Sequence, residues 1–174
     1  KEDTISDFLV NCFKDSDEFI KLFLANAKIN IQNEDKFNIK ARVGFGKNIG
    51  TPDMLIYNKQ TVIVIENKMA ASEGREQTNR YESTEAKNKI IKRFKLDADC
   101  QFHYIFLALD TTIKPKNSKF RFIDYQKFSV GDWFLHDSEL KLLFKHFQEK
   151  LRLFYNPLND PYYALQEGEL DSTQ

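Results

Sequence analysis

The chain has 174 residues, and its 26 basic side chains balance its 26 acidic ones, so the formal net charge is zero. A chain of this length fits one domain, and a hydrophobic content of 41% with 16 phenylalanines excludes a disordered segment. Zero net charge argues against a protein that coats nucleic acid by bulk electrostatics, although it leaves room for a local basic groove.

The pattern of apolar residues predicts helices and strands in an order typical of α/β proteins. In chain order we expect helices over 3–14 and from 17 onward, strands over 37–45, 52–57 and 61–67, a long helix over 74–95, strands over 101–109 and near 120–124, and a helix over 137–155. A hairpin turn at 58–60 places two strands at the centre of a mixed sheet that helices flank. Residues 1–155 are expected to form this domain, and 156–174 a C-terminal tail or linker.

Cysteine content and hydropathy predict a cytoplasmic protein without a membrane partner. Cys12 and Cys100 are too few for a disulfide scaffold, and no cysteine–histidine cluster has the spacing of a zinc site. The longest apolar runs, 62–65 and 104–109, have the length of strands rather than of membrane spans. The start at Lys1 and the proline-bearing tail are compatible with a further domain outside this chain, and with a homo-oligomer.

The most informative residues lie at the two ends of the predicted hairpin. Asp53 follows Pro52 at the start of one strand, and Glu66 and Lys68 end the other. Side chains alternate along a strand, so Glu66 and Lys68 share a face, and the turn brings Asp53 close to Glu66. Two adjacent carboxylates repel unless a cation lies between them, and Mg²⁺ favours carboxylate and phosphate oxygens. A lysine beside that cation can orient water and offset charge on a phosphate.

These residues resemble the PD-(D/E)XK nuclease superfamily, with Pro52-Asp53 as its PD element and Glu66-Asn67-Lys68 as its (D/E)XK element. The resemblance implies a restriction-endonuclease-like αβββαβ core over residues 2–109. It also implies that Asp53, Glu66 and the backbone carbonyl of Asn67 bind Mg²⁺ or Mn²⁺, while Lys68 acts on the hydrolytic water or the transition state.

Gln77 and Tyr81 lie four residues apart on the predicted long helix and therefore share one of its faces. This Gln-x-x-x-Tyr element is similar to that of RecB-like exonucleases and of many bacterial PD-(D/E)XK proteins. The similarity implies that both residues contact the substrate strand and that Gln77 orients the phosphate or the catalytic lysine. Equally, Tyr81 could pack into the core and leave its hydroxyl in water.

The first predicted helix resembles the one that brings a glutamate to the metal site in those proteins, and Glu2 and Asp7 compete for that role. At about 100° per residue, Glu2 lies about 50° from the centre of the apolar stripe and Asp7 about 170° from it. We therefore expect Glu2 to be the metal ligand.

The same residues also have plainer interpretations. Asp53 could cap a turn after Pro52, and Glu66 and Lys68 could form a surface ion pair on an edge strand. The basic residues of 87–95 and 114–119 could form a solvated surface or contact DNA phosphates.

The sequence thus predicts a Mg²⁺-dependent nuclease that hydrolyses phosphodiester bonds, in DNA above all, by means of a metal-activated water. Its expected setting is a bacterial or phage defence, restriction or repair system. Endonuclease and exonuclease action stay open. The alternative is a catalytically inactive nuclease-fold module that binds nucleic acid or a protein partner.

Overall fold

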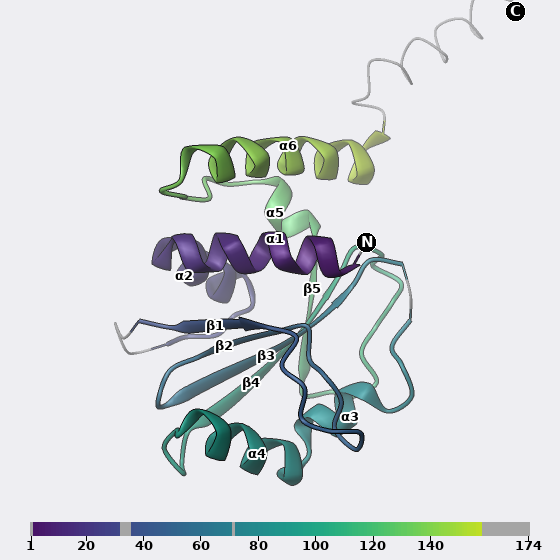
Figure 1. Ribbon diagram of the computed structural model, residues 1–174. Coiled ribbons are helices and arrows are strands. Elements are labelled where there is room, and N and C mark those ends of the chain that lie inside the picture. The colour runs from purple at the N-terminus through teal and green to yellow at the C-terminus, as the bar shows by residue number, and fades with distance from the viewer. Residues whose placement is uncertain (1, 32–35, 71, 158–174) are drawn as a thin grey trace, which may run out of the picture.

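A computed structural model describes residues 2–31, 36–70 and 72–157, in which helices cover both faces of a five-stranded sheet (Figure 1). The elements, in chain order, are α1 (Glu2–Asp15), α2 (Asp17–Asn26), β1 (Asn38–Ala41), β2 (Met54–Tyr57), β3 (Thr61–Lys68), α3 (Gln77–Glu82), α4 (Thr84–Phe94), β4 (Gln101–Ala108), β5 (Phe120–Asp124), α5 (Gln126–Ser129) and α6 (Ser138–Tyr155). The expected α/β class, with a mixed sheet flanked by helices, is confirmed.

The sheet has the order β1-β2-β3-β4-β5, and β3 is its central strand. β1, β2 and β3 pair antiparallel, whereas β4 and β5 continue the sheet parallel to β3. The hairpin turn lies at residues 58–60, where the sequence predicts it. Asn58 Oδ1 closes this turn by accepting hydrogen bonds from the N–H groups of Gln60 and Thr61. All of β3 is buried, which excludes the edge-strand interpretation of its polar end.

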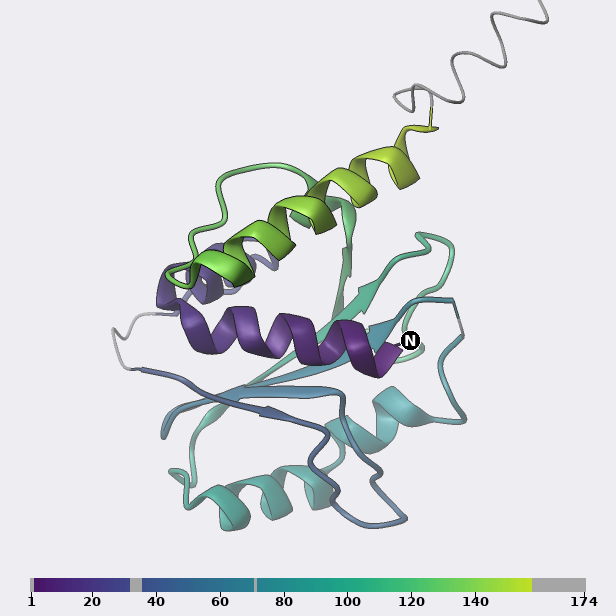
Figure 2. The ribbon, with the colours of Figure 1, turned by 45° about the horizontal axis from the view of Figure 1, so that its top comes forward.

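Two apolar clusters lie on opposite faces of the sheet. Figure 2 shows α1, α2 and α6 over one face, which we call the α1 face, and α3 and α4 over the other, the α3 face. The α1 face is rich in phenylalanine, and the ring centroids of Phe19 and Phe144 lie 5.1 Å apart. The α3 face packs Val62 and Val64 of β3 under Ile90 of α4. Both faces of the central strand are therefore withdrawn from water.

Two predicted elements differ from the structure. The strand expected over 37–45 ends at Ala41, because Arg42 adopts a positive φ of 46° and the chain then forms a loop up to Asp53. The helix expected over 74–95 is divided at Ser83, whose ψ of 152° ends α3. The Ser83 hydroxyl then caps α4 by accepting the N–H of Ala86, so a side-chain cap outweighs the continuous helical pattern.

No helix in the described ranges is both long and apolar enough to cross a membrane. The tail or linker expected over 156–174 lies outside the described residues from 158 onward. That domain boundary therefore stays a prediction.

Candidate active site

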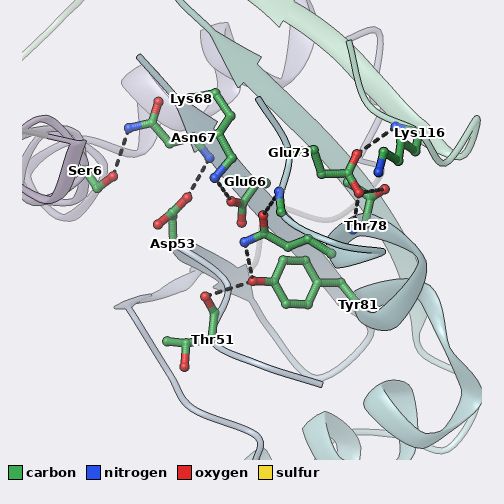
Figure 3. Close-up of polar contacts among 12 residues, drawn as sticks. Ser6, Thr51, Asp53, Glu66, Asn67, Lys68, Glu73, Thr78, Tyr81 and Lys116 are labelled. Atoms are coloured by element: carbon green, nitrogen blue, oxygen red, sulfur yellow. Dashed lines mark hydrogen bonds and ion pairs between the residues drawn. The ribbon is translucent and has the colours of Figure 1, made fainter. Parts of the chain in front are cut away.

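The polar ends of β2 and β3 meet on the α3 face (Figure 3). Met54 pairs with Ile65, and extending this antiparallel register by one residue places Asp53 opposite Glu66. Asp53 Oδ2 accepts a 2.7 Å hydrogen bond from the N–H of Asn67, which ties the start of β2 to the end of β3. The contact that the hairpin geometry predicts is thus present.

Glu66 and Lys68 form a buried ion pair at the end of the central strand. Lys68 Nζ lies 2.6 Å from Glu66 Oε1, and the two side chains are only 10% and 1% exposed, respectively. The pairing is close in distance, yet neither oxygen of Glu66 receives a well-directed hydrogen bond from a described residue. Burial first, and then the negative charge of Asp53, raise the pKa of Glu66 to about 8. The lysine therefore compensates this carboxylate only in part.

These groups fit a hard divalent cation. Asp53 and Glu66 supply carboxylate oxygens, and the N–H and C=O of a strand residue point to the same side, so the Asn67 carbonyl faces the Asp53 side as its N–H does. No cluster of three or more Asp, Glu, His or Cys residues suited to a metal occurs among the residues that the structure describes. Mg²⁺ commonly binds through one or two carboxylates plus waters and a substrate phosphate, so this pair is sufficient.

The structure does not test the metal ligand that we expect from the first helix. α1 begins at Glu2, but the Glu2 side chain lies outside the described part of the structure, and its metal-binding role stays a prediction. Asp7 is half exposed, and its Oδ1 lies 2.7 Å from Nη2 of Arg42. The competing carboxylate is thus engaged by the first residue of the loop that leads to Asp53.

Asn67 faces the α1 side of the sheet, opposite to Glu66. Its amide donates a 2.9 Å hydrogen bond to Ser6 Oγ on α1 and accepts a 2.6 Å hydrogen bond from Tyr125 Oη at the start of α5. These contacts fasten two distant segments to the strand end that carries the ion pair. No local pattern identifies Ser6 or Tyr125, because each lies about sixty residues from its partner.

Gln77 and Tyr81 lie together on α3, and they link this helix to the segment before Asp53. Gln77 Nε2 donates to Tyr81 Oη at 2.9 Å, and Tyr81 Oη donates to the Thr51 carbonyl at 2.9 Å. Gln77 Oε1 accepts the N–H of Gly74 at 3.2 Å. Tyr81 is 2% exposed, and burial is the main reason that its pKa is raised. The ring is therefore part of the core while the hydroxyl holds the loop, and contact with a substrate stays a prediction.

Glu73 is a buried acid that sequence reasoning missed. Its Oε1 accepts hydrogen bonds from the N–H and the hydroxyl of Thr78, and Oε2 accepts the N–H of Lys116 at 2.7 Å. Although burial acts in the opposite direction, these donors hold the pKa of Glu73 below its usual value. These hydrogen bonds from Thr78 and Lys116 to Glu73, which we call the Glu73 clasp, join the loop after β3 to the basic loop between β4 and β5. The only sequence signal that could have identified Glu73 is the presence of an acidic residue in a loop of small residues.

Part of the basic surface predicted on α4 supports the loop before Asp53. Lys89 Nζ donates to the Phe45 carbonyl at 3.2 Å, and Arg93 Nη1 donates to the Gly44 carbonyl at 2.8 Å. Arg93 also lies 5.6 Å from the centre of the Phe45 ring. These two exposed cations therefore also hold main-chain oxygens of the loop, while contact of the basic surface with DNA phosphates stays a prediction.

Comparison with known proteins adds a family match to this geometry. A family model described as the PD-(D/E)XK nuclease superfamily matches residues 1–143, a range that includes the site and most of the fold. No curated protein and no solved structure gives a match. The resemblance inferred from the residues is confirmed at the level of the superfamily, while the RecB-like subdivision stays a prediction.

Proposed function

Because the chain belongs to the PD-(D/E)XK nuclease superfamily, we propose that it hydrolyses phosphodiester bonds of DNA with Mg²⁺ or Mn²⁺ at the ends of β2 and β3. The observation that supports this most strongly is the buried Glu66–Lys68 pair beside Asp53. Buried carboxylates in structural roles usually have both oxygens satisfied by donors, whereas the oxygens of Glu66 have the close Lys68 ammonium but no well-directed hydrogen bond from a described residue. Defence, restriction or repair is the setting we propose for such cleavage.

The proposed roles follow from where each group lies. Asp53, Glu66 and the carbonyl of Asn67 would hold the cation, with Glu2 as a further proposed ligand. A cation held there lowers the pKa of a bound water and offsets negative charge on the phosphate. Lys68 projects from the buried end of β3 into the same space, so its ammonium can donate to the attacking water and to the phosphate as charge builds up.

In the proposed hydrolysis, the oxygen of water forms a bond to phosphorus while the bond from phosphorus to the leaving sugar oxygen breaks. The attacking water loses its proton to solvent, and the leaving oxygen takes one up. Gln77 and Tyr81 border this site from α3, and we propose that they contact the substrate strand in addition to holding the Thr51 segment.

Cleavage of circular, linear and single-stranded DNA in Mg²⁺, Mn²⁺ and EDTA tests the proposal. We expect Lys68→Ala to lower metal-dependent cleavage by about 100-fold or more without loss of the fold. Lys145→Ala, on the exposed surface of α6, removes the same charge far from the site and serves as the matched control. Equal cleavage by wild type and Lys68→Ala would contradict the assignment.

A titration with Mn²⁺ separates this proposal from the non-catalytic alternative. A working site binds Mn²⁺, and binding weakens in Asp53→Asn and in Glu66→Gln because each loses a charged ligand. DNA affinity without any Mn²⁺ binding would instead favour a nuclease-fold module that binds nucleic acid without turnover.

A further inference from the structure

Arg80 on α3 differs from most other arginines because its buried Nε has no hydrogen-bond partner among the residues that the structure describes. Other arginines bond a carboxylate or a main-chain carbonyl, namely Arg42, Arg93, Arg121 and Arg152. Arg80 is half-buried, and its Nε is out of contact with water without an acceptor among the described residues. A buried N–H without an acceptor is unfavourable, and the guanidinium is the cation best shaped for an anion with several oxygens.

The guanidinium lies against the loop that leads to Asp53. At about 100° per residue, Arg80 projects about 60° from Gln77, on the side of α3 away from Thr78. A Cβ added to Gly50 would lie 3.9 Å from Arg80 Nη2 and 3.6 Å from the Tyr81 ring. Gly50 also has a φ of +99°, a conformation that suits glycine. Arg80 therefore lies where the loop before the metal-binding aspartate passes α3.

The charges around Arg80 favour an anion that comes from outside the chain. Tyr81, the next residue on α3, donates its hydroxyl to the Thr51 carbonyl, which leads directly to the segment of Asp53. Asp53 and Glu66 remain with the proposed cation and Lys68, so they do not neutralise Arg80. A substrate strand that places one phosphate at the cation carries further phosphates on both sides of it.

We propose that Arg80 binds a phosphate of the substrate strand that flanks the phosphate being cleaved. This inference rests on the proposed function, because it takes the ends of β2 and β3 as the point of cleavage. The planar donors of the guanidinium can contact two oxygens of one phosphate. Since the flanking phosphate does not react, Arg80 stabilises the bound substrate and the transition state to the same extent.

DNA binding at several salt concentrations tests this contact. The probe is a fluorescent DNA oligonucleotide in Mn²⁺, bound to Lys68→Ala so that it is not cleaved. Adding Arg80→Ala is expected to weaken binding about 3- to 10-fold and to reduce the slope of log affinity against log salt by about 0.7–0.9, the amount of one phosphate contact. Adding Arg80→Lys keeps the slope and restores part of the affinity. Adding Lys145→Ala instead changes neither quantity.

Steady-state cleavage with Arg80→Ala alone gives a second readout. Uniform binding predicts that KM rises by the same factor with kcat unchanged. An unchanged salt slope, or a fall in kcat at constant KM, would overturn the proposal, the latter because it would place Arg80 on the reacting phosphate. If the wild type does not cleave DNA but Arg80→Ala still lowers the salt slope, the proposed function fails and the phosphate contact stands.

Discussion

The two faces of the sheet treat the end of β3 in different ways. On the α1 face, the Asn67 side chain is fully buried, and its amide is bonded by Ser6 from one side and by Tyr125 from the other. On the α3 face, Glu66 is equally buried, but its carboxylate receives no well-directed hydrogen bond from the part of the chain that the structure describes, and its pKa is raised to about 8. Two adjacent residues of β3 thus have different roles. Asn67 fixes the position of the strand, whereas Glu66 stays available to a ligand.

This difference extends into the layers around β3. Under α1, phenylalanine rings of four different segments pack together, among them Phe19, Phe128 and Phe144. The α3 face has an apolar cluster of its own, but polar contacts such as the Tyr81–Thr51 hydrogen bond connect the loops around the site. Variants can change the two sets of contacts separately.

The largest effect is expected from removing the charge on the α3 face. Glu66→Gln should lower metal-dependent cleavage by about 100- to 1000-fold, because it removes a charged ligand where negative charge develops. The metal-free variant should unfold within a few degrees of the wild type, because the gain from removing a buried charge beside Asp53 is opposed by the loss of the partner of Lys68. Cleavage assays and thermal unfolding in EDTA measure both, with the exposed Glu149→Gln as control. Strong destabilisation would mean that Glu66 is a structural residue.

The next effect is expected on the α1 face. Asn67→Ala should lower the free energy of unfolding by about 2–4 kcal/mol, because the buried hydroxyls of Ser6 and Tyr125 lose their bonds to this amide. Denaturant unfolding measures the loss, and Asn88→Ala on the exposed side of α4 is the control. The cleavage rate of the folded fraction should change only a few-fold, since the proposed ligand is the main-chain carbonyl. A loss of cleavage as large as that of Glu66→Gln would contradict the separation of the two faces.

A smaller effect is expected at the hydrogen bond by which Tyr81 of α3 holds the loop before Asp53. Tyr81→Phe keeps the buried ring but removes the donor to the Thr51 carbonyl, so the segment of Asp53 is held less firmly. We expect Mn²⁺ affinity to fall about 3- to 10-fold, which corresponds to one net hydrogen bond. Tyr104→Phe is the matched control, because the Tyr104 hydroxyl is buried without a hydrogen-bond partner among the described residues. Equal Mn²⁺ binding by both variants and the wild type would show that the hydrogen bond does not position Asp53.

The smallest effect is expected at the Glu73 clasp, and it depends on pH. The folded state lowers the pKa of Glu73, so the carboxylate stabilises the fold above the pKa of the unfolded chain, and this stabilisation is lost as pH falls through the folded value. Glu73→Gln should therefore cost about 1 kcal/mol near neutral pH, and this cost should shrink only as the pH falls below the ordinary glutamate pKa of about 4.3. Unfolding of wild type and variant across this range measures the difference. A constant difference at all pH values would mean that the clasp does not depend on the charge.

The sequence predicted those features that depend on neighbouring residues in the chain. Strand alternation and the turn at 58–60 predicted the approach of Asp53 to Glu66, which the register confirms. The helix over 74–95 was wrong at Ser83, because its pattern of apolar residues continues while a side-chain cap starts a new helix. The strand over 37–45 was too long, because alternation does not reveal the positive φ of Arg42.

What the sequence by itself determined is the class of fold, from the periodicity of its apolar residues, and the approach of Asp53 to Glu66, because side-chain direction along a strand has a period of two. The superfamily followed from the resemblance of Pro52-Asp53 and Glu66-Asn67-Lys68 to its motifs. Only the tertiary structure decided that Glu66 is incompletely compensated, that Asn67 fastens α1, and that the buried Nε of Arg80 has no acceptor in the described ranges. These properties depend on burial and on groups that come from distant segments, and neither is contained in the local spacing of residues. The chemistry proposed for the α3 face therefore depends on how the other layers place and dehydrate its charges.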